Sequence, residues 1–137
     1  MPLLSERPAG EQIFIVLVLP SIFGAICGVL LGISAGVYTV LTLLGILGGI
    51  AAGYDHPTAS EGALRGVPGG ALFGTFIMLS HAITGEDAKA KLPEPHILLP
   101  IATTIISVGL GAIGGALRAR QLGNEQARSS RVGTIRR

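Results

Sequence analysis

The stretch Gly24–Gly36 reads GAICGVLLGISAG, in which every fourth residue is glycine. On a helix, residues four apart share a face, so these glycines form a stripe that carries no side chains. In water, each glycine would weaken a helix by about 1 kcal/mol. Between membrane helices, the same stripe lets a second backbone approach closely. The stretch therefore predicts a membrane helix that packs tightly against a neighbour.

Three later apolar segments repeat this four-residue spacing of small residues. Each ladder would give its helix a face on which another backbone can lie. Since ladders on every helix exceed what one four-helix bundle needs, we expect some of them to face other copies or another membrane protein. The glycines expected to pack helices are Gly24, Gly28, Gly32, Gly45, Gly49, Gly53, Gly62, Gly66, Gly70, Gly74, Gly111 and Gly115.

The composition supports a membrane protein. Of 137 residues, 49% are hydrophobic and 13% are charged, whereas soluble domains have about 25% charged residues. No charged residue occurs from Gln12 to Tyr54, which is far longer than the ~20 residues that cross a bilayer once. Further uncharged runs cover residues 66–85 and 95–117. We therefore predict an all-α, polytopic membrane protein with four transmembrane helices and glycine-ladder packing.

The expected organisation is one transmembrane domain, residues 13–120, between two polar ends. Residues 1–12 form a short N-terminal segment, and residues 121–137 form a flexible basic tail. The motif GISAG before Val37 suits a turn, but the first helix could also extend to Gly36, and both alternatives stay open. The expected helices cover about 13–33, 37–54, 59–84 and 96–120.

Local signals refine these boundaries. Pro20 and Pro68 lie inside apolar segments and should bend the helices that contain them, because proline removes a backbone donor. Thr58 and Glu61 have the T-x-x-E spacing of a capping box at the start of a helix.

The pattern L-G-x-x-G-G occurs at Leu44–Gly49 and again at Leu110–Gly115. It is consistent with two duplicated, parallel hairpins. The alternative is that glycine-rich membrane helices resemble one another by composition, and the sequence leaves both open.

Basic residues predict the orientation. With four crossings, eight of the ten Lys and Arg residues share one side of the membrane, and only Lys89 and Lys91 lie on the other. Cytoplasmic loops and ends carry the excess of basic residues. Both termini are therefore expected in the cytoplasm.

Arg65 is the sharpest candidate for a functional residue. Glu61 precedes it by one helical turn, in the order that favours an ion pair. One interpretation is an interfacial pair in which Arg65 snorkels to headgroups and Glu61 caps the helix. The other is that Arg65 faces the bundle, where it lines an entry path for an anion or forms a gate with Asp55.

His81 is the ionisable residue that lies within an apolar run, near the end of its helix. It is either an interfacial histidine or a pore residue. His96 with the nearby acidic residues matches no metal motif, so no metal or cofactor is expected. The single Cys27 cannot form an internal disulfide.

The sequence contains no zinc-protease, P-loop or nucleophile-elbow motif, so no enzymatic activity is expected. It also has no Trp and no basic-aromatic interleaving, which argues against nucleic acid. We predict an oligomeric channel or transporter for ions or small solutes, with pore or gate candidates Arg65, Glu61, His81 and Asp55. The alternative is a non-catalytic accessory or assembly subunit of a larger membrane complex. The expected partners are the lipid bilayer and either further copies or other membrane subunits.

Overall fold

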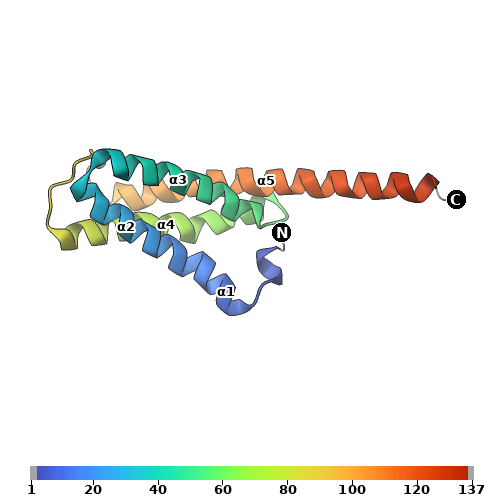
Figure 1. Ribbon diagram of the computed structural model, residues 1–137, viewed down its shortest axis with the longest axis horizontal. Helices are drawn as coiled ribbons and strands as arrows, with labels where there is room; N and C mark the ends of the chain where they lie inside the picture. Colours follow the sequence, from blue (N-terminus) through green and yellow to red (C-terminus); the bar gives the residue numbers. More distant parts are fainter. Residues whose placement is uncertain (1–2, 136–137) are drawn as a thin grey trace.

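The computed structural model describes the backbone of residues 3–135 and the side chains of residues 3–130. Within this range the chain is helical and contains no strand. Four helices are long and apolar enough to cross a membrane: Ala9–Ile33, Ala35–Tyr54, Ala59–Thr84 and Leu98–Ser130. They lie side by side as a bundle (Figure 1). The predicted all-helical class with four candidate membrane spans is confirmed, and it indicates a multi-pass membrane protein.

The first span is built from several pieces. A short 3-10 helix, η1 (Leu4–Glu6), precedes α1 (Ala9–Ile13). A π-helical turn, η2 (Phe14–Val18), then leads into α2 (Leu19–Ile33). The helix starts earlier than the expected residue 13, because Pro8 lies just before Ala9 and suits a helix start. The π-helical turn lies directly before the helix that contains Pro20.

The junction between the first two spans is a single residue. Ser34 is extended, with φ −154° and ψ 120°, and its side chain accepts a hydrogen bond from the amide of Val37. This N-cap starts α3 (Ala35–Tyr54). The first span therefore ends at Ile33 rather than extending to Gly36, which decides between the two alternatives left open by the sequence.

Helix α4 (Ala59–Thr84) begins at a cap, because the Thr58 hydroxyl accepts a hydrogen bond of 3.3 Å from the amide of Glu61. It ends at Gly85, whose φ of 66° lies in the left-handed region that glycine adopts readily. Pro68 lies inside α4, and the helix continues past it.

The expectation for the last helix was wrong. Helix α5 (Leu98–Ile135) does not end near Arg120 but continues through the segment predicted to be a flexible tail. Figure 1 shows this part of α5 projecting beyond the other helices. Residues 121–128, QLGNEQAR, are mostly good helix formers, and a helix already nucleated in a bundle extends at little cost. Residues 136–137 of the predicted tail lie outside the described residues.

The twelve ladder glycines face neighbouring parts of the same chain. A Cβ atom added at Gly66 would lie 2.5 Å from the carbonyl carbon of Ser107, and one at Gly53 would lie 2.7 Å from the Cα of Gly111. At Gly24 it would meet the backbone of Phe73. Every other ladder glycine likewise has a neighbour within 4 Å of such an atom. The expectation that some ladders also face other copies or another membrane protein stays a prediction.

The two halves of the bundle are packed differently. Cys27, Leu31, Ile77 and Leu99 form a buried cluster near the loop that joins α4 to α5. That loop is tied to the bundle, because the amide of Lys89 donates a hydrogen bond of 2.9 Å to the carbonyl of Leu31. The half nearer the N-terminal segment has no such cluster among the described residues.

Candidate functional site

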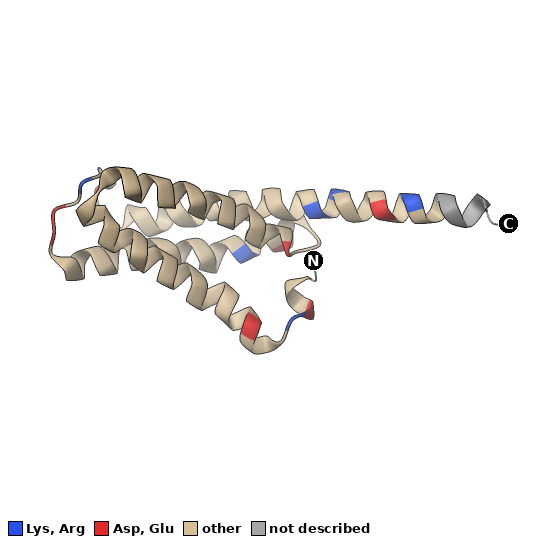
Figure 2. Ribbon diagram, viewed as in Figure 1, with Lys and Arg blue, Asp and Glu red and all other residues tan. Residues whose placement is uncertain are grey.

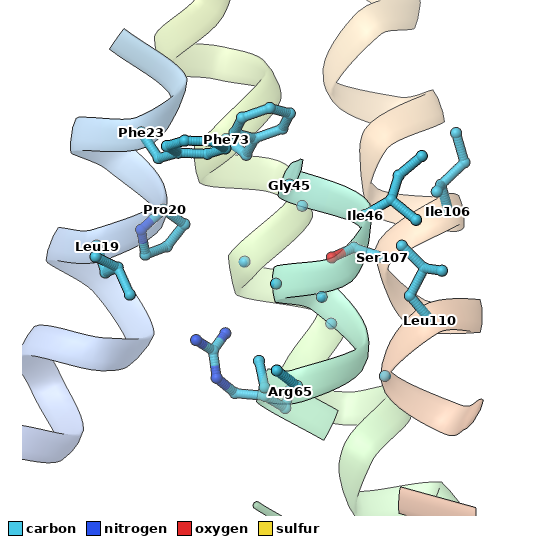
Figure 3. A pocket seen from close by; sticks show the side chains of 18 of the residues that line it. Leu19, Pro20, Phe23, Gly45, Ile46, Arg65, Phe73, Ile106, Ser107 and Leu110 are labelled. Carbon is cyan, nitrogen blue, oxygen red and sulfur yellow. The ribbon is translucent and has the colours of Figure 1, made fainter. Parts of the chain in front are cut away.

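A cavity of about 680 Å³ fills the less densely packed half of the bundle. Its walls come from η2 and all four long helices, and Arg7 and Asp55 lie at one end. Most lining residues are apolar or glycine, as Figure 3 shows for one side of the cavity. The glycines matter here because they leave the space that side chains would fill.

Arg65 contributes a charge to this cavity. Figure 3 shows its side chain reaching from α4 toward the helix that carries Leu19 and Pro20. Its Nη2 atom donates a hydrogen bond of 2.7 Å to the carbonyl oxygen of Ile15. Nη1 lies over Gly69, where an added Cβ atom would be only 2.9 Å away. The absence of a side chain at Gly69 therefore makes room for the guanidinium.

Most of the hydrogen-bonding capacity of Arg65 is unused. A guanidinium has five N–H donors, and the bond to Ile15 is the one that the described residues accept from it. Its Nε atom is buried without a hydrogen-bond partner among those residues. The remaining donors are available to an anion that enters the cavity.

The carbonyl of Ile15 is available because of the backbone of the first span. In the π-helical turn, the amide of Leu19 donates to the carbonyl of Phe14, one residue earlier than in an α-helix. The next residue, Pro20, has no N–H to donate. The carbonyl of Ile15 is thus left without its usual helical donor, and the guanidinium of Arg65 replaces that donor.

A pair of charges lies at one end of the cavity. Arg7 Nη2 lies 3.2 Å from the Asp55 carboxylate, and Arg7 Nη1 lies 3.0 Å from that of Glu11. The backbone is joined here too, because the amide of Leu4 donates to the carbonyl of Asp55 at 3.0 Å. Asp55 therefore binds Arg7 and not Arg65, the gate partner that was hypothesised for it.

The expected ion pair between Glu61 and Arg65 is not formed. Glu61 is exposed, and Arg65 donates to the carbonyl of Ile15 instead. An exposed pair one turn apart contributes only about 0.3–0.5 kcal/mol. The partly buried carbonyl of Ile15 has lost its helical donor, so the hydrogen bond from Arg65 to this carbonyl is worth more.

His56 lies beside this end of the cavity, in the turn between α3 and α4. Burial, and then the positive charge of Arg65, lower the pKa of His56 from its ordinary value of 6.5. Glu61 and Asp55 act in the opposite direction. Its Nε2 atom is buried without a partner in the described part of the chain. The net effect of these surroundings favours the neutral form of the imidazole.

His81 lies at the other end of the bundle. A Cβ atom added at Gly32 would be 3.9 Å from the ring of His81 and 2.8 Å from Glu86. His81 does not line the cavity, and neither does Glu61, whereas Arg65 and Asp55 do. No group of three His, Cys, Asp or Glu side chains in the described residues could hold a metal ion.

Two aromatic rings mark the end of the cavity opposite Arg7. Phe23 of α2 and Phe73 of α4 stack with ring centroids 5.8 Å apart (Figure 3). Gly45 of α3 lies against them, and an added Cβ atom there would be 3.2 Å from the ring of Phe23. Beyond these rings begins the buried cluster around Cys27 and Ile77.

Sequence reasoning found Arg65 and Asp55 but missed the residues that complete the site: Arg7, Ile15, Pro20 and the two phenylalanines. Pro20 carried a signal, because a proline inside a helix always leaves an upstream carbonyl without its donor. No signal in the sequence pairs that carbonyl with Arg65.

Comparisons with known proteins leave the family of this chain open. No protein-family model matches the chain, and no curated protein or solved structure shows a significant similarity to it.

Proposed function

We propose that the chain is an integral membrane transporter or channel for small anionic solutes. The supporting observation is the guanidinium of Arg65, which extends from a candidate membrane helix into a cavity and keeps most of its donors unused. A charge at membrane depth costs at least ~2.5–3.5 kcal/mol, and such residues usually mark a solute path. A merely structural arginine would have its donors occupied.

The arrangement favours a carrier over an open pore within one copy. The cavity reaches Arg7 and Asp55 at one end, while the Phe23–Phe73 stack and the buried cluster obstruct the other. A solute would cross only if these helices rearranged, as they do in alternating access. That the chain assembles into an oligomer stays a prediction.

The glycine ladders would be what holds the cavity walls in place. In this proposal, α4 packs on α2 and α5 through backbone-to-backbone contact, because its stripe has no side chains. Both termini would face the cytoplasm, as the excess of basic residues suggests. Figure 2 is compatible with this orientation, because charged residues gather at the two ends of the bundle and along the projecting part of α5.

A non-catalytic accessory subunit is the second candidate, and the projecting part of α5 favours it. Residues 121–130 are almost entirely exposed and extend beyond the bundle. A helix that makes no contact within its own bundle gives a partner subunit a surface to bind.

Flux from proteoliposomes tests the proposal. The solutes are chloride, methanesulfonate and decanesulfonate, which are permanently anionic and cannot cross as neutral acids. We expect the wild type to move at least one of them. Arg65→Gln should abolish that flux, and Arg65→Lys should reduce it, because lysine lacks the planar fork. Arg120→Gln, at an exposed position of α5 outside the cavity, is the matched control and should leave flux unchanged.

Equal flux in wild type and Arg65→Gln would remove Arg65 from a solute path. A chain that folds only with another membrane protein, and moves none of the three anions, would favour the accessory subunit.

A further inference from the structure

We infer that the cavity binds an anionic amphiphile with a single hydrocarbon chain, its head at Arg65 and its tail directed toward the Phe23–Phe73 stack. The inference rests on the proposed function for the class of solute, an anion, and goes further in requiring an apolar tail. A binding experiment can test it independently of transport.

The head site is the guanidinium of Arg65. One N–H is fixed on the carbonyl of Ile15, which holds the group in place, and the others remain for a ligand. A guanidinium binds carboxylate, sulfonate or phosphate oxygens through paired hydrogen bonds. The nearest acidic residue that lines the cavity, Asp55, is already paired with Arg7 at 3.2 Å. Asp55 still acts on Arg65 through its charge, but it takes none of the hydrogen-bond donors of Arg65, which are available to an incoming anion.

Apart from Arg7 at one end and the hydroxyl of Ser107, the rest of the wall offers a hydrophilic ion little in place of its water. Two of its hydroxyl groups are used by the backbone: Thr42 donates to the carbonyl of Tyr38 at 2.9 Å, and Thr103 donates to that of Gly70 at 2.8 Å. Between Arg65 and Phe73 the wall is mainly glycine and aliphatic side chains. A fully hydrated anion would lose its water there without replacement, whereas a hydrocarbon tail gains from the burial.

The dimensions suit a chain of medium length. Arg65 and Phe73 lie on one helix, so their Cα atoms are about 12 Å apart along its axis. The volume of about 680 Å³ lies within the range of ~300–1,000 Å³ typical of small-molecule sites. The stacked rings of Phe23 and Phe73, with centroids 5.8 Å apart, form an apolar end wall for the tail.

The cavity also opens to the side, where a tail would enter from the bilayer. Leu19 of α2 and Leu44 of α3 both line the cavity, yet they are 50% and 52% exposed. A residue that lines a cavity and is also half exposed lies at an opening. In the bilayer this opening would face lipid, the phase from which amphiphiles reach a protein.

The test is photolabelling of the full chain in phosphatidylcholine nanodiscs, with decanesulfonate that carries a diazirine at mid-chain as the probe. We expect the label on cavity residues between Arg65 and Phe23, located by mass spectrometry. Unlabelled decanesulfonate should compete, while methanesulfonate, with the same head and no tail, should not. Decyltrimethylammonium, with the same tail and a positive head, should also fail to compete.

Two variants probe the two ends of the ligand. Arg65→Gln should reduce competable labelling about tenfold or more, the value of a charge-assisted hydrogen bond. Gly48→Leu should block the tail, because Gly48 lines the cavity and an added Cβ there meets nothing within 4 Å. Arg120→Gln is the control and should label like the wild type.

Labelling that methanesulfonate displaces as well as decanesulfonate would overturn the requirement for a tail and leave a plain anion site. Uniform labelling of lipid-facing residues, unchanged in Arg65→Gln, would overturn the site itself. A Leu44→Cys variant that forms a disulfide dimer and loses labelling would assign the side opening to a second copy. Site-specific labelling without flux of any anion would support the binding site and refute transport, so the two proposals fail separately.

Discussion

The Nη2 atom of Arg65 donates a hydrogen bond of 2.7 Å to the carbonyl oxygen of Ile15, fifty positions earlier in the chain. This bond connects α4 to the π-helical turn of the first span. It joins two local irregularities, a charge in an apolar helix and a carbonyl that Pro20 leaves without a donor. Each irregularity would be costly alone, and together they compensate one another.

Pro20 and Arg65 should therefore be energetically coupled. Arg65→Gln in the wild type leaves the carbonyl of Ile15 unpaired, which should cost about 1–3 kcal/mol of unfolding free energy. In a Pro20→Ala background, the new amide at residue 20 can donate a hydrogen bond to the carbonyl of Ile15. Arg65→Gln should then lower the unfolding free energy by less. A double-mutant cycle measured by unfolding in mixed micelles should give a coupling of about 1 kcal/mol.

The matched control pairs Pro68→Ala with Arg65→Gln. Pro68 is also inside a helix, but Arg65 donates to the carbonyl of Ile15 and not to a carbonyl of α4. Equal coupling in both cycles would show that the compensation is not local to Ile15.

Gly28 and Gly70 should not tolerate a side chain. At Gly70 an added Cβ atom would lie 2.6 Å from the Cα of Thr104, and at Gly28 it would be 3.0 Å from the carbonyl carbon of Ile77. Gly28→Leu and Gly70→Leu should each lower stability by about 3 kcal/mol or more, since backbone must shift to admit them. Thermal denaturation of the purified protein measures this.

Gly109 provides the comparison for these substitutions. An added Cβ atom at Gly109 meets nothing within 4 Å. Gly109→Leu should be neutral, or stabilising by up to about 1 kcal/mol through helix propensity. If all three variants unfolded alike, the ladders would not pack helices.

Acidification should destabilise the protein through His56. Because its pKa is lowered from 6.5 in the folded chain, the unfolded chain binds more protons just below that pH. Stability is therefore complete above about pH 6.5 and falls as the pH drops below it. Melting temperatures at pH 7.5 and 5.5 should differ for the wild type and much less for His56→Asn.

His96→Asn is the control for this pH dependence, since His96 is exposed. Carboxylates titrate near pH 4 and contribute little in this range. A drop in melting temperature that survives in His56→Asn would assign the effect to another group.

Thiol labelling of intact cells should reveal the topology. The native Cys27 is fully buried, so it contributes little background. We expect an impermeant maleimide to reach Asp87→Cys, in the loop between α4 and α5, but not Gln126→Cys on the projecting helix. The reverse pattern would place both termini outside and contradict the prediction from basic residues.

Helix α4 shows how much of the fold the sequence could predict. Its expected range, 59–84, agrees with the structure, because Thr58, Pro57 and Gly85 are strong local boundary signals. The end of α5 could not be predicted in the same way. Residues 121–128 are mostly good helix formers, but Gly123 and Asn124 interrupt them and give no clear end signal, so the anchored part of the helix decides its continuation.

The candidate site was predictable only in part. Arg65 and Asp55 are conspicuous in the sequence because charges are rare there. Their partners, Ile15 and Arg7, follow from how α4 and the N-terminal segment pack on the bundle. Every residue has a backbone carbonyl, so the sequence indicates which carbonyl lacks a donor only where a proline has removed that donor.

The uninterrupted course of α5 has a mechanical consequence. One of the close contacts between α5 and α4 is at Gly111, where an added Cβ atom would lie 2.8 Å from the carbonyl carbon of Gly62. Along the axis of α5, Ser130 is about 28 Å from Gly111 in one direction. Thr103, in the cavity wall, is about 12 Å from Gly111 in the other direction. A partner that pushed the projecting arm sideways would swing Thr103 in the opposite direction by a little under half as much. The α5 helix would then act as a lever through which events outside the membrane adjust the width of the cavity.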